Sequence, residues 1–306
     1  MNKVRIVSVS MPGNGTVAAN VEKMVSYIDT AGACQPDLVV FTEIARELGV
    51  KDALDLDGEP VPGPATEAIG AAAKKHNTHV VFGMIEKDGD HKHNASVLVG
   101  RDGQVTGRYH KVQPTIGEIE KGIIPGTEAP AFDTDCGRVG MCICFDLKFP
   151  EVGMMLARSK ARIVCFSSMF CGGTRQEAWA RDHGFFLVTS HGTQSSIVDP
   201  CGRRLAWTGF EEPKVASGDL LPFAIADINS DCKTYHLDYN QDKLGAIQKR
   251  YGLGVRFHIM RREATFVLES VMDDVRVEEV EREFELEDLW AYYDRARGVK
   301  RECLGG

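Results

Sequence analysis

Short apolar runs alternate with longer amphipathic stretches along the first 230 residues of the chain. Runs rich in Val, Ile, Leu and Phe predict short buried strands. They lie at residues 4–10, 38–41, 79–85, 95–99, 105–109, 139–143, 162–167, 185–190, 195–199, 204–208 and 223–228. Apolar residues spaced three and four positions apart predict helices at 16–33, 65–75 and 174–183, and Pro150 begins another. This alternation predicts an α/β fold.

The stretch from 79 to 130 departs from that alternation. Its strands are separated only by tight turns, and Asp102-Gly103 is a hairpin signal. We therefore predict a β-meander followed by a long loop at 112–130, which contains Gly117 and Gly122. Long loops inside compact domains more often carry function than short ones do.

The pattern changes again near residue 230. A polar helix is predicted at 239–249, a pair of strands at 254–259 and 265–268, and a charged, Glu-rich helical stretch at 275–296. We therefore expect two regions, a main domain at 1–230 and a C-terminal extension at 231–306.

Composition excludes several classes of function. The net charge is −8, the isoelectric point is near 5.6, and no block of Lys and Arg is present, so nucleic acid is not the expected partner. No apolar run approaches the roughly 20 residues that span a bilayer. The N-terminus leads directly into a predicted strand, and we expect a cytoplasmic protein without membrane contact.

Nine cysteines, an odd number without a repeating spacing, indicate reduced thiols and no disulfide framework. Cys142-x-Cys144 is too closely spaced for a zinc pair, and no His/Cys cluster completes a set of four ligands. We expect no metal.

One of these cysteines, Cys144, lies at a predicted turn between a buried strand and a helix. Helix N-termini and the N–H groups of such turns favour a thiolate and a developing oxyanion. An inert buried cysteine is the alternative, because free cysteine is among the most buried residue types. Attack on a carbonyl or nitrile carbon also needs a base and a cation. Glu43 follows the strand at 38–41 and Lys111 follows the strand at 105–109, so both are present.

The order and setting of these residues resemble the nitrilase, or carbon–nitrogen hydrolase, superfamily. The matching pieces are Phe41-Thr42-Glu43, Tyr109-His110-Lys111, Gly126, and Cys144-Phe145-Asp146 followed by Phe149-Pro150-Glu151. Each piece is common alone, whereas the set is specific and extends over roughly residues 3 to 230. The resemblance implies a four-layer αββα sandwich and a Glu-Lys-Cys triad.

The resemblance also assigns roles. Cys144 is the implied nucleophile, which forms a thioester and expels ammonia or an amine. Glu43 is the implied general base, and Lys111 holds the oxyanion with the backbone N–H of Phe145. No cofactor is implied.

A second glutamate is expected in the loop after the lysine, where it positions Lys111 and the substrate. Glu118 and Glu120 compete for this role. Glu120-Lys121 before Pro125-Gly126 is closer to the family pattern, so we favour Glu120. Asp146 and Glu151 are expected to hold the turn at the cysteine through hydrogen bonds.

The segment 167–175 follows the strand after the nucleophile, and by resemblance it lines the pocket. Met169 is expected to contact substrate there, and Arg175 either pairs with a substrate carboxylate or is a surface residue. The segment 179–184 departs from the family's frequent Arg-Ala-x-Glu-Asn run, so specificity does not transfer.

We expect hydrolysis of a small-molecule amide or N-carbamoyl substrate. A nitrile substrate and amide-dependent acyl transfer are the alternatives. By analogy with the superfamily, residues 231–306 are expected to contribute to a homodimer or a larger assembly.

Overall fold

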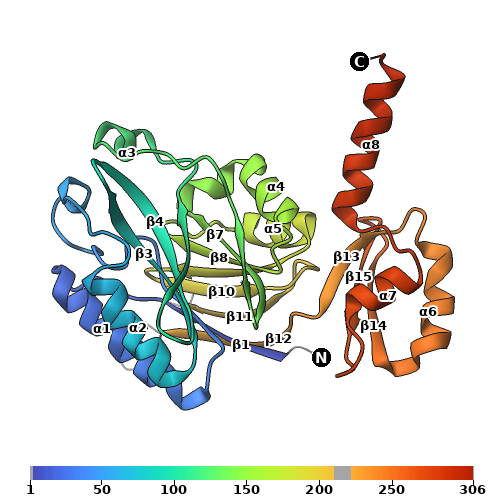
Figure 1. The fold of residues 1–306 in the computed structure, drawn as a ribbon, viewed down its shortest axis with the longest axis horizontal. Coiled ribbons are helices and arrows are strands. Elements are labelled where there is room, and N and C mark those ends of the chain that lie inside the picture. Colours follow the sequence, from blue (N-terminus) through green and yellow to red (C-terminus); the bar gives the residue numbers. More distant parts are fainter. Residues whose placement is uncertain (1–2, 210–221, 306) are drawn as a thin grey trace.

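The computed structural model describes residues 3–209 and 222–305, so positions 1, 2 and 210–221 of the expected main domain and position 306 of the expected extension lie outside the described residues. Two six-stranded sheets pack face to face, with helices on their outer sides (Figure 1). The predicted four-layer αββα sandwich is therefore confirmed. None of the helices in the described ranges is long and apolar enough to cross a membrane.

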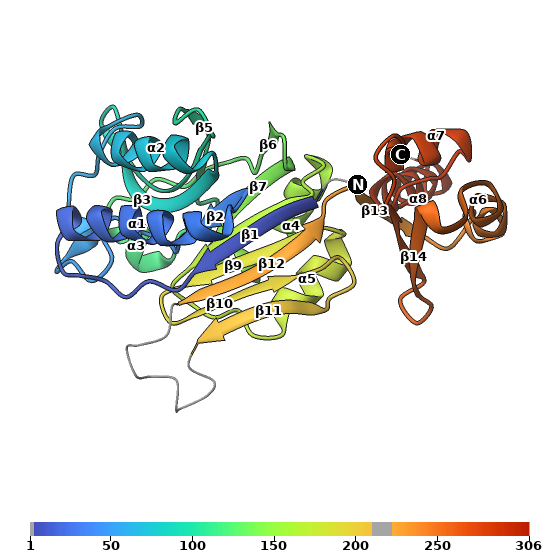
Figure 2. The ribbon, with the colours of Figure 1, turned by 90° about the horizontal axis from the view of Figure 1, so that it is seen from below.

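The first sheet has the strand order β12-β1-β2-β3-β4-β5. Its strands are β1 (Lys3–Val9), β2 (Leu38–Val40), β3 (His79–Asp88), β4 (His91–Val99), β5 (Val105–His110) and β12 (Phe223–Asn229). Figure 2 shows β1 and β12 side by side, although more than 200 residues separate them in sequence. Strands β3, β4 and β5 form the predicted meander.

The second sheet has the order β11-β10-β9-β8-β7-β6. Its strands are β6 (Ala131–Thr134), β7 (Gly137–Ile143), β8 (Ile163–Ser168), β9 (Phe186–His191), β10 (Gln194–Val198) and β11 (Arg204–Gly209). Central strands β7, β8 and β9 run parallel, so each consecutive pair needs a long crossover connection, which here contains a helix. Strand β6 was not predicted, because its four residues, Ala-Phe-Asp-Thr, are too few to show a strand pattern and they form only the edge of the sheet.

The helices of the sandwich are α1 (Val17–Ala31), α2 (Pro64–His76), α4 (Pro150–Arg158) and α5 (Arg175–His183). Thr16 caps α1 by accepting a hydrogen bond from the N–H of Ala19. Alternate residues of β2 face opposite layers: Val39 packs with α1 and α2, whereas Leu38 and Val40 pack against the second sheet. Burial on both faces explains why β2 reads as a continuous apolar run.

Hydroxyl groups join the two sheets near the ends of their central strands. The Ser167 hydroxyl donates to the carbonyl of Phe41 at 2.8 Å, and the Thr42 hydroxyl donates to the carbonyl of Ser168 at 2.6 Å. Ser8 and Ser190 make equivalent bonds between β1 and β9. These bonds fix the end of β2 beside the end of β8.

The C-terminal region has a third sheet of order β13-β15-β14 and a small apolar core of its own. Its elements are β13 (Cys232–His236), α6 (Leu244–Tyr251), β14 (Val255–Met260), β15 (Thr265–Ser270), α7 (Val277–Glu283) and α8 (Leu289–Cys303). It contacts the sandwich through the Trp290 indole N–H, which donates to the carbonyl of His183, and through an ion pair between Arg162 and Glu278. In Figure 1, α8 extends away from both sheets.

The charged helical stretch predicted at 275–296 is divided between two helices, α7 and α8. The chain turns at Glu285, whose φ of 49° is left-handed, and Asp288 then begins α8 by accepting hydrogen bonds from the N–H groups of Trp290 and Ala291. A side chain that caps a new helix competes with continuation of the old one. Helix α3 (Ile116–Glu120), inside the predicted loop at 112–130, was also missed.

Buried Asp146 connects the two halves of the sandwich. Its Oδ2 accepts hydrogen bonds from the Tyr109 hydroxyl on β5 and from the N–H of Ile143 on β7, at 2.6 and 2.8 Å. Its Oδ1 accepts one from the N–H of Gln113 at 2.8 Å. The predicted role of Asp146 at the turn is confirmed. Glu151 is exposed on α4 and its side chain makes no hydrogen bond to another described residue, so the same prediction for Glu151 is wrong.

We expect Asp146→Asn to lower the free energy of unfolding by about 2–3 kcal/mol, because an amide cannot accept all three bonds and leaves a buried donor unpaired. Tyr109→Phe removes one of the bonds and should cost about 1 kcal/mol. Urea unfolding measures both values. Asp57→Asn, the same change at an exposed position, is the control. A loss for Asp146→Asn no larger than that of the control would contradict this role.

Candidate active site

Glu43 lies just after β2, where the chain crosses β3 at close range. A side chain at Gly83 would come within 2.5 Å of the backbone N of Ile44, so only glycine allows this crossing. The crossing turns Glu43 into the protein, and only 4% of the residue is exposed. Its carboxylate accepts hydrogen bonds on both oxygens, on Oε1 from Lys111 and on Oε2 from the N–H of Met169.

Lys111 follows β5 and is buried, with 1% of its surface exposed. Its backbone N–H donates to the carbonyl of Asn94 on the neighbouring strand, and its carbonyl accepts from Gly126. A side chain at Gly126 would come within 2.3 Å of the carbonyl oxygen of His110, which accounts for glycine in this motif. The ammonium of Lys111 donates to Glu43 at 2.7 Å and to Glu118 at 2.9 Å.

The second glutamate beside Lys111 is Glu118, so the preference for Glu120 is wrong. Thr115 caps α3, and its N–H donates to Oε2 of Glu118 at 2.7 Å, which turns this carboxylate inward. Glu120 lies two residues further, about 200° around the helix, and is exposed. The position of the cap, which sequence spacing did not reveal, decides which glutamate faces the lysine.

Asn94 completes the group and was not anticipated from the sequence. It lies on β4, is 1% exposed, and its amide nitrogen is 2.8 Å from Oε1 of Glu43 and 2.6 Å from Oε1 of Glu118. A polar residue directly before the apolar run 95–99 was the available signal.

Cys144 begins a short 3-10 helix, η3 (Cys144–Lys148), directly after β7. Its φ of 46° is left-handed, which is unfavourable for a residue with a side chain and typical of strained functional turns. Burial and the Glu43 carboxylate raise the pKa of the Cys144 thiol to about 12, although the charge of Lys111 and the N–H of Met169 lower it. The resting group at neutral pH is therefore the thiol.

Negative charges outnumber positive charges around Lys111. Burial alone would lower the pKa of Lys111, but the carboxylates of Glu43 and Glu118 outweigh it and hold that pKa above its ordinary value. Burial raises the pKa of Glu118, but Lys111 and Asn94 outweigh it and the net shift is downward. The centre therefore has two carboxylates, one ammonium and a neutral thiol, so removing the thiol proton requires an acceptor.

The residues expected to bind substrate, and a histidine near them, differ in how far they are buried and in which groups they contact. The N–H of Met169 reaches Glu43, while its side chain is 47% exposed. Phe145 is half-buried and meets Phe149 edge to face, with 5.1 Å between ring centres. Arg175 is exposed at the start of α5 and makes no ion pair with a described residue. His191, at the end of β9, lies close to the sulfur of Cys171.

Among the described residues, one group has three possible metal ligands: His79, Asp135 and Cys136. The guanidinium of Arg101 is 2.8 Å from Asp135 and 3.7 Å from the sulfur of Cys136. A cation already lies against these ligand atoms, so the group does not suit a metal ion.

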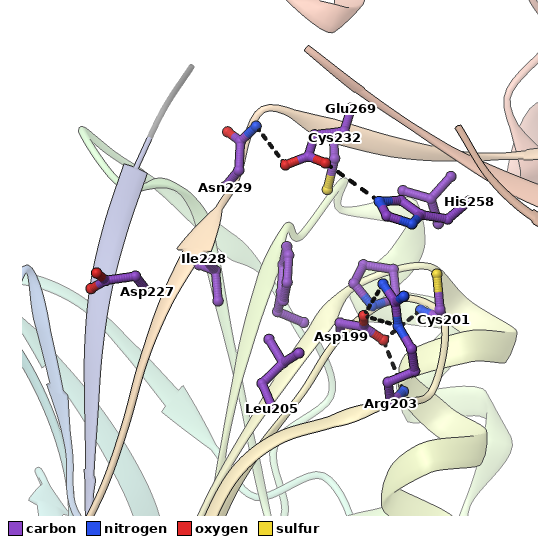
Figure 3. A pocket seen from close by; sticks show the side chains of 13 residues that line it. Asp199, Cys201, Arg203, Leu205, Asp227, Ile228, Asn229, Cys232, His258 and Glu269 are labelled. Atoms are coloured by element: carbon purple, nitrogen blue, oxygen red, sulfur yellow. Dashed lines mark hydrogen bonds and ion pairs between the residues drawn. The ribbon is translucent and has the colours of Figure 1, made fainter. Parts of the chain in front are cut away.

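A cavity of about 200 Å³ lies between the sandwich and the C-terminal sheet and is lined by residues outside the Cys144 centre (Figure 3). Its charged groups already have partners, and Asp227 pairs with Arg5 outside the cavity. Asp199 forms an ion pair with Arg203, and Glu269 accepts hydrogen bonds from Asn229 and His258. We assign it no part in the chemistry at Cys144.

Comparison with known proteins identifies the family of this chain. Residues 3–232 match the family model described as carbon-nitrogen hydrolase. The omega-amidase NIT2 of Homo sapiens is 24% identical over 244 residues, which are 71% of this chain and 88% of that protein. Nitrilase 3 of Arabidopsis thaliana is 34% identical over 196 residues, which are 52% of this chain and 56% of that protein.

Solved structures show the same fold. An amidase from Nesterenkonia sp. superimposes with a TM-score of 0.63 at 18% identity, over 81% of this chain and 96% of that chain. Nit3 of Saccharomyces cerevisiae, a member of branch 10 of the nitrilase superfamily, has a TM-score of 0.63 at 20% identity, over 85% of this chain and 97% of that chain. With a family match over most of its length, this chain belongs to the carbon–nitrogen hydrolase family of the nitrilase superfamily.

Proposed function

We propose that this protein hydrolyses a small-molecule amide or N-carbamoyl compound through a thioester on Cys144. The observation that carries the proposal is the burial of Lys111 between Glu43 and Glu118, with a neutral thiol beside them. When Glu43 takes the thiol proton it loses its charge, so Lys111 can hold the negative charge that develops on the substrate oxygen in its place.

The steps follow from the resting protonation states. Glu43 accepts the thiol proton as sulfur attacks the carbonyl carbon, and the oxyanion is held by Lys111 and the N–H of Phe145, the second residue of η3. The tetrahedral adduct collapses, and Glu43 returns the proton to the departing nitrogen. A water molecule, deprotonated by Glu43, then attacks the thioester, releases the acid and restores the thiol.

Names of similar proteins favour an amide over other substrates. Relatives from Homo sapiens and Saccharomyces cerevisiae are omega-amidases, and a solved relative from Nesterenkonia sp. is an amidase. A glutamate-to-glutamine variant of that amidase shows the result of Michael addition of acrylamide at its active site cysteine. Such an adduct fits a sulfur nucleophile that still reacts without the base.

Nitrile hydrolysis is the second candidate. The observation in its favour is that Nitrilase 3 is 34% identical over the matched residues, a higher identity than that of the human omega-amidase. Amide-dependent acyl transfer uses the same thioester with an amine in place of water, and it remains an alternative for the second half of the reaction.

Two residues of the segment after β8 are proposed to contact substrate. Met169 is half-exposed and its own N–H binds Glu43, so its side chain lies next to the base. Arg175 is exposed and has no carboxylate partner among the described residues, so it is available for a substrate carboxylate.

We expect Cys144→Ala to abolish ammonia release, a loss of more than about 1,000-fold, because no thioester can form. Ammonia is measured for a panel of amides, N-carbamoyl amino acids, ureido acids and nitriles, and the best substrate identifies the branch. Cys201→Ala is the matched control and should retain turnover, because it changes a partly buried thiol in the cavity between the sandwich and the C-terminal sheet. Equal loss in both variants would argue against Cys144 as nucleophile.

Glu43→Gln should separate the role of Glu43 as base from the role of Cys144 as nucleophile. Turnover should fall by about 100- to 10,000-fold because the proton acceptor is lost. Alkylation of Cys144 by iodoacetamide at pH 8 should become faster, because the carboxylate that raises the thiol pKa is gone while Lys111 remains. Mass spectrometry of the Cys144 peptide measures the rate, with the Cys201 peptide of the same sample as reference. Slower alkylation in the variant would refute this electrostatic assignment.

A pair of matched variants tests the second glutamate. Glu118→Gln should lower kcat by about 10- to 100-fold, because Lys111 loses one of its two charged partners. Glu120→Gln is the same change two residues away on an exposed surface and should stay within about twofold of the unmodified protein. Steady-state kinetics on the best substrate distinguishes the two, and a larger effect at Glu120 would reverse the assignment.

A further inference from the structure

The carboxylate of Glu43 has two oxygens in different surroundings. Oε1 accepts hydrogen bonds from the ammonium of Lys111 at 2.7 Å and from the amide of Asn94 at 2.8 Å. Oε2 accepts one, from the N–H of Met169 at 2.9 Å. Two donors occupy the lone pairs of Oε1, so Oε2 is the oxygen with a lone pair free for a proton.

The N–H of Met169 links Oε2 of Glu43 to the thiol of Cys144. Glu43 raises the pKa of the Cys144 thiol, and the N–H of Met169 lowers it. The same N–H binds Oε2. One backbone donor therefore acts on both the sulfur and Oε2, which makes Oε2 the oxygen expected to take the thiol proton.

The orientation of the Asn94 amide follows from its neighbours. Ionised carboxylates only accept hydrogen bonds, so the group facing Glu43 and Glu118 must be the NH₂. The two contacts are short, at 2.8 and 2.6 Å, and the Asn94 oxygen is buried without a partner among the described residues. The amide is thus held through its donor side, toward the two carboxylates.

Backbone pairing brings Asn94 to this place. The N–H of Lys111 donates to the carbonyl of Asn94 at 2.9 Å, which continues the antiparallel ladder of β4 and β5 by one residue. The side chain that donates to both carboxylates therefore comes from the residue whose backbone holds Lys111.

We propose that Asn94 is a positioning residue for this centre. Its amide holds the carboxylates of Glu43 and Glu118 together on one ammonium, and it occupies Oε1 of Glu43 so that Oε2 takes the thiol proton. Without it, two like charges share one cation, and Oε1 competes for the proton. The proposal concerns the order of events at the site and rests on the proposed function for its catalytic consequence.

Three variants test the proposal: Asn94→Ala, Asn94→Asp and Ser96→Ala. Asn94→Ala removes the donor, and Asn94→Asp keeps the shape while adding a third carboxylate. Ser96→Ala is the control, because Ser96 is buried on the same strand and its hydroxyl has no partner among the described residues.

The first readout is the pH dependence of kcat/KM for the best amide. Its acid limb reports the carboxylate pair, because protonating either carboxylate disables the base or releases the lysine. Loss of a donor to the ionised pair makes protonation easier, so the limb should move upward by about one pH unit in Asn94→Ala and further in Asn94→Asp. KM should change by less than about threefold. The pH profile of Ser96→Ala should be the same as that of the unmodified protein. An unchanged acid limb in both Asn94 variants would overturn the proposal.

The second readout needs no substrate. Alkylation of Cys144 by iodoacetamide at pH 9 should be several-fold slower in Asn94→Asp, because the added carboxylate disfavours the thiolate, and it should be unchanged in Ser96→Ala. If the unmodified protein hydrolyses no compound of the panel, the proposed function fails while this measurement still judges Asn94. Equal alkylation rates in Asn94→Asp and the unmodified protein would overturn the role of Asn94 alone. Circular dichroism verifies that both Asn94 variants are folded.

Discussion

The ammonium of Lys111, enclosed between two carboxylates, is the interaction on which the rest of the site depends. Removing a charge from water costs several kcal/mol, and only close opposite charges and complete hydrogen bonding offset that cost. Glu43 and Glu118 supply the charges within 3 Å. The three residues come from the ends of β2 and β5 and from α3, so these elements must converge before the ammonium can be buried.

The same arrangement explains how a weak acid becomes a nucleophile. Burial disfavours the charged thiolate, and the two carboxylates outnumber the one ammonium. Both effects raise the pKa of the Cys144 thiol, so it keeps its proton at rest. A permanently ionised thiolate would need a second cation. The site instead places a proton acceptor beside the sulfur, and charge separates only when a substrate provides an oxyanion to be held by Lys111.

The sandwich holds this geometry through polar contacts inside an otherwise apolar core. Asp146 accepts bonds from β5, from the end of β7 and from the segment after Lys111, which binds the turn at Cys144 to the strand that carries the lysine. Serine and threonine hydroxyls join β2 to β8 in the same way. Buried polar groups of this kind are costly when unpaired, so they favour one register of the two sheets over its alternatives.

The sequence by itself determined the alternation of strands and helices and, through the set of motifs that carry the family resemblance, the expectation that Glu43, Lys111 and Cys144 belong to one site, because each of these motifs is local and follows an apolar strand. Only the tertiary structure decided between Glu118 and Glu120, because the choice depends on where Thr115 begins α3. The contact of Asn94 with both carboxylates likewise depends on the pairing of β4 with β5, which brings Asn94 next to Lys111. Side-chain direction around a helix and partners across a sheet depend on contacts between distant parts of the chain, which residue spacing along the sequence does not encode.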